Sequence, residues 1–227
     1  MIKAVIFDMD GTLIDSNDFH ARSWQEILAK HGHEVTFEQV RHQIGKGGDQ
    51  LMPVFLSEDE VERDGERIEE ERTDLFKREY LPWIDPFPMT RELFERIKRD
   101  GKQVVLASSS KGKELDAYKK IARIDDLIEE ATSSDDAERS KPHPDIFEAA
   151  LTKLDGVAPE EAIVVGDTPY DAQAASKAGL ATIGLLCGGF PEDELRASGC
   201  IAIYRDPADL LARYDESPLG RGRSRAD

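Results

Sequence analysis

Short apolar runs alternate along this chain with segments in which apolar residues recur at helical spacing. Residues 4–7 (Ala-Val-Ile-Phe) form the first such run, and similar runs recur further along. Continuous apolar runs are typical of parallel strands buried on both faces, and their alternation with helices favours an α/β fold. We therefore predict core strands at residues 3–7, 103–107, 162–165 and 182–186, an edge strand at 200–204, and a short strand at 129–132.

Helical patterns occupy two of the intervals between these strands. Residues 90–99 predict a helix that Asp100-Gly101 closes. The alanine-rich residues 172–178 predict a tightly packed helix that ends at Gly179, because glycine commonly follows the last turn.

Residues 16 to about 82 contain no strand pattern. Ser16 can cap a helix that runs to about His31, and a second helical stretch, from about residue 58 to 80, carries a thin apolar stripe amid dense charge. Such charge is typical of a solvated helix face. The exit, residues 82–88, is rich in proline and hinge-like. We therefore predict an α-helical cap of residues 16–85, inserted into a core of residues 1–15 and 86–227.

Composition narrows the classes of function. The chain has 227 residues, enough for one α/β domain with an insert, and a net charge of −17. This charge argues against wrapping nucleic acid or binding anionic membranes, but it permits a small anionic substrate at a locally positive site. The two cysteines form no disulfide framework and lack metal-ligand spacing.

The chain carries no secretory or membrane-spanning apolar segment. We expect a cytoplasmic, soluble monomer or weak homodimer that contacts neither nucleic acid nor membrane. The Gly/Arg-rich segment from Ser217 onward predicts a frayed C-terminal end.

Two carboxylates, Asp8 and Asp10, directly follow the first predicted strand, and Gly11 permits a tight turn after them. Ligands of open α/β sheets bind beyond the carboxyl ends of the strands. Two acids this close repel each other, and a divalent cation is the simplest way to hold them. Taken alone, the segment is equally compatible with a surface turn.

Three later segments place polar residues at comparable positions. Residues 108–111 (Ser-Ser-Ser-Lys) follow the second core strand, Lys141 precedes a proline-rich helix entry, and Asp167 and Asp171 follow the strand at 162–165. Together with Asp8, this order resembles the haloacid dehalogenase (HAD) superfamily, in particular its phosphatases and phosphomutases with a helical cap. The resemblance extends to about residue 211 and implies a Rossmann-like parallel-sheet core with an inserted cap.

The resemblance implies four catalytic residues for phosphoryl transfer. Asp8 would be the nucleophile that forms an aspartyl phosphate, and Asp10 would protonate the leaving oxygen and then activate water. Ser108 would donate its hydroxyl to the phosphate, assisted by backbone N–H groups near Ser109, which we expect to bind substrate. Lys141 would neutralise phosphate charge and restrain Asp8. A serine-rich turn and a surface lysine are the structural alternatives.

The resemblance also implies a Mg²⁺ site, since this ion prefers oxygen ligands. The ligands would be the Asp8 side chain, the Asp10 backbone carbonyl and Asp167, while Asp171 would bind through water or orient the others. As an alternative, Asp167 can cap the next helix, a role compatible with metal binding.

Two residues of the cap are further candidates for substrate binding. His20 lies four residues before Trp24 on an apolar helix face, where histidines are usually packed; in the similar mutases a histidine here assists alignment and cap coupling. Lys46 lies in a Gly-Lys-Gly-Gly loop and could meet an anionic group of the substrate. A flexible connection with a solvated lysine explains that loop equally well.

We therefore predict a Mg²⁺-dependent phosphatase that hydrolyses a small phosphorylated metabolite of the sugar phosphate or phosphoglycolate type. A phosphomutase similar to β-phosphoglucomutase is the main alternative, since it uses Asp8 and Asp10 in the same way. A non-catalytic regulator that binds a phosphorylated ligand is a further alternative. Asp10 argues against dehalogenase and phosphonate hydrolysis, because those branches of the superfamily lack the second aspartate.

Overall fold

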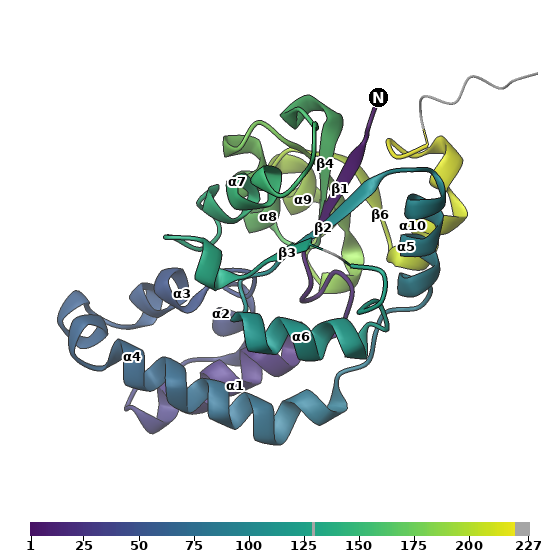
Figure 1. Cartoon of the computed structure of the whole chain (residues 1–227). Helices are drawn as coiled ribbons and strands as arrows, with labels where there is room; N and C mark the ends of the chain where they lie inside the picture. Colours follow the sequence, from purple (N-terminus) through teal and green to yellow (C-terminus); the bar gives the residue numbers. More distant parts are fainter. Residues whose placement is uncertain (129, 221–227) are drawn as a thin grey trace, which may run out of the picture.

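The computed structural model describes residues 1–128 and 130–220, in which one parallel sheet is flanked by helices (Figure 1). Within these residues the sheet has six strands in the order β3-β2-β1-β4-β5-β6, the order of doubly wound α/β folds. All predicted strands are present, with ends within one residue of the prediction, although residue 129 lies outside the described residues. The strands are β1 (Ala4–Phe7), β2 (Gln103–Ala107), β3 (Glu130–Thr132), β4 (Ala162–Gly166), β5 (Ala181–Leu185) and β6 (Cys200–Tyr204).

Helices connect the strands and build a separate layer beyond the carboxyl end of the sheet (Figure 1). The α-helices are α1 (Asn17–Lys30), α2 (Phe37–Arg41), α3 (Gly48–Phe55), α4 (Glu58–Leu75), α5 (Thr90–Arg99), α6 (Gly112–Ile121), α7 (Asp145–Thr152), α8 (Pro169–Lys177), α9 (Glu192–Ala197) and α10 (Pro207–Ala212). A π-helical segment, η1 (Phe76–Tyr80), continues α4, and short 3₁₀ turns are η2 (Leu81–Trp83), η3 (Ser134–Asp136), η4 (Pro159–Glu161), η5 (Leu186–Gly188) and η6 (Tyr214–Glu216).

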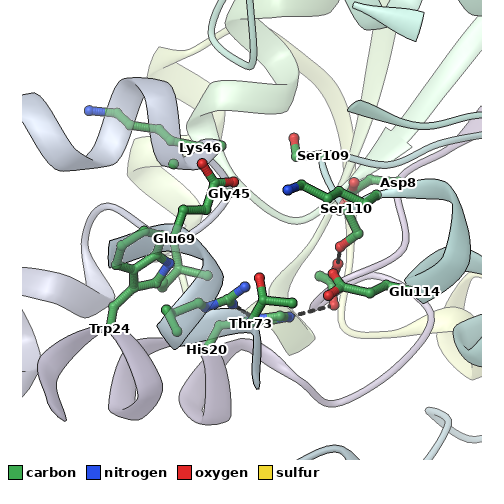
Figure 2. Close-up of a pocket in the computed structure, with 16 residues that line it drawn as sticks. Asp8, His20, Trp24, Gly45, Lys46, Glu69, Thr73, Ser109, Ser110 and Glu114 are labelled. Carbon is green, nitrogen blue, oxygen red and sulfur yellow. Dashed lines mark hydrogen bonds and ion pairs between the residues drawn. The ribbon is translucent and has the colours of Figure 1, made fainter. Parts of the chain in front are cut away.

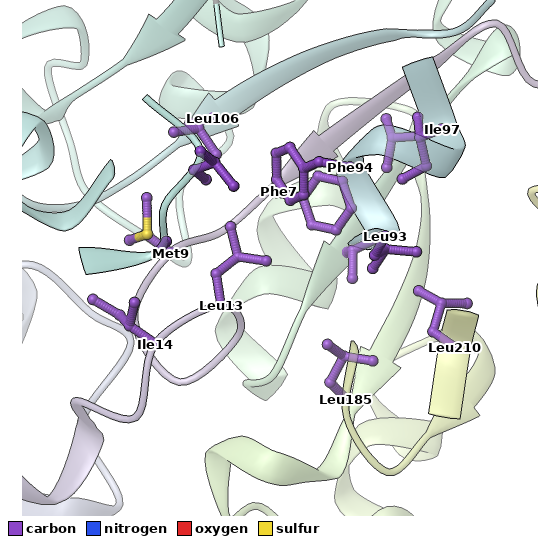
Figure 3. Packing of buried hydrophobic residues seen from close by; sticks show 14 of the residues in the cluster. Phe7, Met9, Leu13, Ile14, Leu93, Phe94, Ile97, Leu106, Leu185 and Leu210 are labelled. Atoms are coloured by element: carbon purple, nitrogen blue, oxygen red, sulfur yellow. The ribbon is translucent and has the colours of Figure 1, made fainter. Parts of the chain in front are cut away.

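Successive residues of β1 pack on opposite faces of the sheet, as the pleat requires. Val5 and Phe7 belong to a core shared with α5, α6 and α10, and Phe7 stacks on Phe94 with ring centroids 4.6 Å apart (Figure 3). Ala4 and Ile6 pack on the other face against α7 and α8. Because both faces are covered, β1 is apolar throughout, which explains why the sequence predicted it well.

Helices α1 to α4 pack around an apolar cluster of their own, which includes Trp24, Leu28, Leu51 and Ile68. The two links to the core run side by side: Asp15 N–H donates to the Asp85 carbonyl, at 2.9 Å. The prediction of a Rossmann-like core with a helical cap is therefore confirmed. The limits of the cap at residues 16 and 85 stay a prediction.

The C-terminal segment differs from its prediction. Ser217 and Leu219 are buried, and Leu219 packs in the cluster that contains Phe7. Since Ser217 also donates to the Tyr214 carbonyl at 2.6 Å, residues 217–220 are anchored and not frayed. Residues 221–227 lie outside the described residues.

Candidate active site

The carboxyl ends of three neighbouring strands meet at one crevice. Asp8 follows β1, Ser108 follows β2 and Asp167 follows β4, and Lys141 enters from the loop before α7. The parallel order β2-β1-β4 therefore brings together segments that are up to 159 residues apart in the sequence (167 − 8). This is the edge at which ligands bind in doubly wound folds.

Three carboxylates lie buried at this edge. Asp8, Asp167 and Asp171 each present an oxygen within 4.8 Å of the others. The buried ammonium of Lys141 lies 2.5 Å from Oδ1 of Asp8 and 2.7 Å from Oδ1 of Asp171. One cation thus faces three carboxylates, which leaves the cluster with an excess of negative charge when all three are ionised.

The pKa values of these groups reflect the excess of negative charge in the cluster. Burial, together with the charges of Asp171, Asp167 and Asp10, raises the pKa of Asp8, while Lys141 acts in the opposite direction. Burial and the charge of Asp171 raise the pKa of Asp167 to about 7. Burial alone would lower the pKa of Lys141, but the two carboxylates it contacts raise that pKa above its ordinary value. Lys141 is therefore a permanent cation at neutral pH.

The Asp167 carboxylate is held by two donors from the other side of the crevice. Thr12 donates to its Oδ1 at 2.7 Å, and Asn17 donates to its Oδ2 at 2.8 Å. Gly11 adopts a φ of +75° and lies so close that a Cβ there would be 2.3 Å from Asp167 Oδ2. Asp167 does not cap α8, because Thr168 does so, with Asp171 as its capping-box partner. The helix-cap alternative for Asp167 is therefore wrong.

The donor set fits a hard divalent cation. Mg²⁺ is bound through carboxylate oxygens and keeps several waters, and a doubly charged ion would offset the excess negative charge of the cluster. Asp8 and Asp167 are oriented from different strands toward this shared position, and the carboxylate of Asp171 is engaged with Lys141 and Thr168. The carboxylates of three predicted metal ligands, Asp8, Asp167 and Asp171, thus lie together; the coordination of Mg²⁺ stays a prediction.

Asp10 lies beside this cluster and accepts hydrogen bonds from three side chains. Ser16 and His20 contact its Oδ1 at 2.7 and 2.8 Å, and Ser110 contacts its Oδ2 at 3.2 Å. Burial raises the pKa of Asp10, but contacts with His20, Ser16 and Ser110 lower it, so that the net pKa is below the ordinary value. Ser16 is the N-cap residue of α1, as predicted, but its side chain makes no capping hydrogen bond because its hydroxyl donates to Asp10.

His20 is buried and stacked on Phe76, with ring centroids 4.1 Å apart. Burial and the charge of Arg72 lower its pKa, while Asp10 raises it, and the net pKa is below the ordinary value. Arg72 can only donate, and it contacts Nδ1 of His20. Neutral His20 therefore carries its proton on Nε2 and donates it toward Asp10. His20 contacts Asp10 and also lines the cavity between the cap and the core.

A cavity between the cap and the core opens onto Asp8 and Asp10 (Figure 2). Ser109 and Ser110 line it from the core, while Ser108 is buried and accepts a hydrogen bond from the Ser110 N–H at 3.1 Å. The Ser109 hydroxyl is buried and has no hydrogen-bond partner among the described residues. A hydroxyl in that state is available to a ligand.

The glycine loop of the cap, residues 45–48, closes the cavity and lies on the core. A Cβ at Gly47 would be 2.1 Å from Ser140 Oγ, and Asp49 accepts from the Ser140 N–H at 3.1 Å. The Lys46 ammonium donates to Gln43 at 2.6 Å and lies over the Tyr170 ring, and Figure 2 shows it directed away from Asp8. Lys46 lines the cavity, but its charge is engaged elsewhere in this structure.

Sequence reasoning missed several residues of the site. Asn17 carried no prediction, yet its side chain donates to Asp167, 150 positions away in the sequence. Glu69, Arg72 and Thr73 lie in the charge-rich stretch predicted to be solvated, yet all three line the cavity. That prediction is wrong for this face of α4. Their order Glu-x-x-Arg-Thr spans one helical turn, and this spacing was the available signal that they share a face.

Comparisons with known proteins agree with this geometry. A family model described as haloacid dehalogenase-like hydrolase matches residues 5–185. The chain is similar to a phosphorylated carbohydrates phosphatase of Thermotoga maritima, with 26% identity over 92% of this chain and 97% of the relative. It is also similar to a pyrophosphatase PpaX of Bacillus cereus, with 28% identity over 80% of this chain and 82% of the relative.

Among solved structures, a hydrolase from Pseudomonas syringae superposes with a TM-score of 0.85. It is 29% identical to this chain, and the match covers 94% of this chain and 98% of that one. The similarity therefore includes both the sheet and the helical cap.

Proposed function

Since the chain belongs to the haloacid dehalogenase-like hydrolase family, we propose that it is a Mg²⁺-dependent phosphatase that hydrolyses a small phosphorylated metabolite through an aspartyl phosphate. The observation that carries this proposal is the pair Asp8 and Asp10 at one end of the cavity, with Asp8 in contact with Lys141. The predicted family is confirmed, and the relatives named a phosphatase and a pyrophosphatase support the reaction class.

In the first step, an Asp8 carboxylate oxygen attacks phosphorus as the bond from phosphorus to the leaving oxygen breaks. Lys141, 2.5 Å from Asp8 Oδ1, keeps the carboxylate oriented and offsets the charge of the incoming phosphoryl group. Ser109, whose buried hydroxyl lacks a partner among the described residues, and the nearby Ser108 supply donors for the phosphoryl oxygens.

Asp10 donates a proton in the first step and accepts a proton in the second. Although His20, Ser16 and Ser110 lower the pKa of Asp10 in the free protein, we propose that Asp10 carries a proton in the substrate complex and gives it to the leaving oxygen, which departs as an alcohol. The resulting carboxylate then takes a proton from water, whose oxygen attacks phosphorus and releases phosphate from Asp8. The donors Ser16, His20 and Ser110 hold Asp10 beside the cavity for both transfers.

Asp8 and Asp167, with Asp171 behind them, would hold Mg²⁺, and the cluster Asp8, Asp167 and Asp171 supports this proposal. When bound, the ion supplies positive charge that stabilises the phosphoryl oxygens in the transition state. The role of Thr12 and Asn17 is to keep Asp167 directed toward that position.

A phosphomutase is the second candidate function. The contact between His20 and Asp10, at 2.8 Å, favours it, because a histidine at this place belongs to the resemblance with mutases. The two functions differ in whether water or a sugar hydroxyl accepts the phosphoryl group from Asp8.

Steady-state phosphate release from a panel of phosphorylated metabolites, with Mg²⁺ present, tests the proposal. The panel contains sugar phosphates, phosphoglycolate, nucleotides and β-glucose 1-phosphate, whose products are examined for isomerisation. Release of phosphate from one metabolite supports the phosphatase. Glucose 6-phosphate without free phosphate would support the mutase. Turnover unchanged in excess chelator would contradict the role of Mg²⁺.

We further propose a cytoplasmic monomer or weak homodimer whose partner is its small substrate and not nucleic acid or membrane. None of the helices in the described part of the chain is both long and apolar enough to span a membrane. Sedimentation at increasing protein concentration tests the proposed assembly state.

A further inference from the structure

The outer wall of the cavity is built by the cap and carries no assigned role. Trp24 on α1 and Glu69 and Thr73 on α4 face the cavity across from Asp8 (Figure 2), and Arg72 on α4 also lines it. If Asp8 receives the phosphoryl group, this wall meets the remainder of the substrate. Its charges therefore bear on which leaving groups the site accepts.

Glu69 is a half-buried carboxylate that makes no hydrogen bond or ion pair with any described residue. It lies against the backbone of Gly48, where an added Cβ would be 3.0 Å from the Glu69 carboxyl carbon. Gly48 thus leaves room for the carboxylate at the cavity wall. An unpaired carboxylate in a partly enclosed site gains from a donor in the ligand and repels an anion.

The cationic side chains near Glu69 either contact other residues or are exposed to solvent. Arg72 donates to His20 and, at 3.2 Å, to Ser23, and its guanidinium packs over the rings of Trp24 and Phe76. The Lys46 ammonium lies over Tyr170. Lys111, on the core side, is exposed, and solvent screens its charge.

We infer that Glu69 is a specificity-determining residue that selects a hydroxyl-bearing leaving group and disfavours a substrate with a second anionic group. Hydroxyls of a sugar or polyol can donate to the Glu69 carboxylate, and the Thr73 hydroxyl and the Trp24 indole offer further polar contacts. This inference rests on the proposed phosphatase function and narrows its substrate to sugar or polyol monophosphates over pyrophosphate and phosphoglycolate.

The test compares kcat/KM of four proteins on four substrates. The proteins are the wild type, Glu69→Gln, Gly48→Ala and the control Glu70→Gln, which changes an exposed carboxylate on the same helix. The substrates are a hexose phosphate, phosphoglycolate, pyrophosphate and phosphoethanolamine, and thermal unfolding verifies that each variant is folded.

We expect the wild type to favour the hexose phosphate. In Glu69→Gln the ratio of kcat/KM for hexose phosphate to that for phosphoglycolate should fall about tenfold or more, because a charge-assisted hydrogen bond is lost and a repulsion relieved. Gly48→Ala should lower the same ratio less, since it displaces the carboxylate without removing its charge. Glu70→Gln should leave the ratio unchanged.

An unchanged ratio in Glu69→Gln would overturn the inference, as would a wild-type preference for pyrophosphate, phosphoglycolate or phosphoethanolamine. In each of these cases the proposed phosphatase stands, because phosphate is still released. A different outcome is that the wild type releases phosphate neither from these substrates nor from the generic substrate p-nitrophenyl phosphate. That result would contradict the proposed function, and the inference, which rests on it, would fail as well.

Discussion

His20 Nε2 lies 2.8 Å from Asp10 Oδ1, so that the first helix of the cap is joined to the proposed acid–base residue of the core. Arg72 contacts the other ring nitrogen and thereby determines which nitrogen carries the proton. Arg72 from α4 and His20 from α1 thus act together on the carboxylate of Asp10, which follows β1.

Replacing His20 tests whether this contact positions Asp10. In His20→Ala we expect kcat to fall roughly tenfold to a hundredfold, because a general acid that is poorly oriented transfers its proton less effectively. His20→Gln, which keeps an N–H donor, should retain more activity. Steady-state kinetics across pH measure both variants. Equal losses in the two would indicate that the ring serves packing alone.

Removing the buried cation should destabilise the protein strongly. Lys141→Ala leaves Asp8 and Asp171 without their partner, and breaking a buried ion pair costs roughly 3–5 kcal/mol of unfolding free energy. The control is Lys3→Ala, which breaks the exposed pair of Lys3 with Glu161 and should cost less than about 1 kcal/mol. Urea denaturation measures both. Similar losses in the two variants would contradict the structural role of Lys141.

Asn17 offers a test of the metal site that does not rely on activity. Asn17→Ala removes one of the two donors to Asp167, and loss of such an outer contact typically weakens metal affinity about 10- to 100-fold. Thr12→Val removes the other donor and should act in the same direction. The measured quantity is the Mg²⁺ concentration needed to raise the melting temperature of each variant. Wild-type Mg²⁺ dependence in both variants would argue that Asp167 binds no ion.

The raised pKa of Asp167 predicts how stability depends on pH without metal. Its folded pKa is about 7 and its unfolded value 3.8, so the folded state binds more protons between these values. Its contribution to stability is therefore full below about pH 4 and is lost as pH rises through 7. We expect the melting temperature in chelator to fall by roughly 5 °C between pH 5 and pH 8, and Mg²⁺ to reverse the loss. A melting temperature that rises over this range would contradict the burial of an acidic cluster.

The core strands and the four chemical segments could be predicted because their signals are local. Residues 4–7 are buried on both faces and followed at once by Asp8, so apolarity and chemistry are adjacent in the sequence. The same holds for β2 with Ser108 and for β4 with Asp167. The family followed from the order of these segments, and it is confirmed.

The partners that cross between cap and core could not be predicted in this way. Ser16 has the ordinary appearance of a helix cap, and only the fold brings Asp10 within reach of its hydroxyl. Arg72 lies 52 positions from His20, inside a stretch whose charge suggested solvent. Lys46 shows the converse, since its loop was equally compatible with a ligand contact and with a solvated lysine, and its side chain turns toward Tyr170. Side-chain direction depends on tertiary packing, which local patterns do not contain.

The most direct test of the central claim is the rate of phosphate release by Asp8→Asn relative to the wild type, with Mg²⁺ and a substrate that the wild type hydrolyses. The account predicts a fall of at least about a thousandfold in a protein that remains folded, because the asparagine amide cannot form the acyl phosphate. Phosphate release at the wild-type rate would contradict the assignment of Asp8 as the nucleophile and, with it, the proposed mechanism.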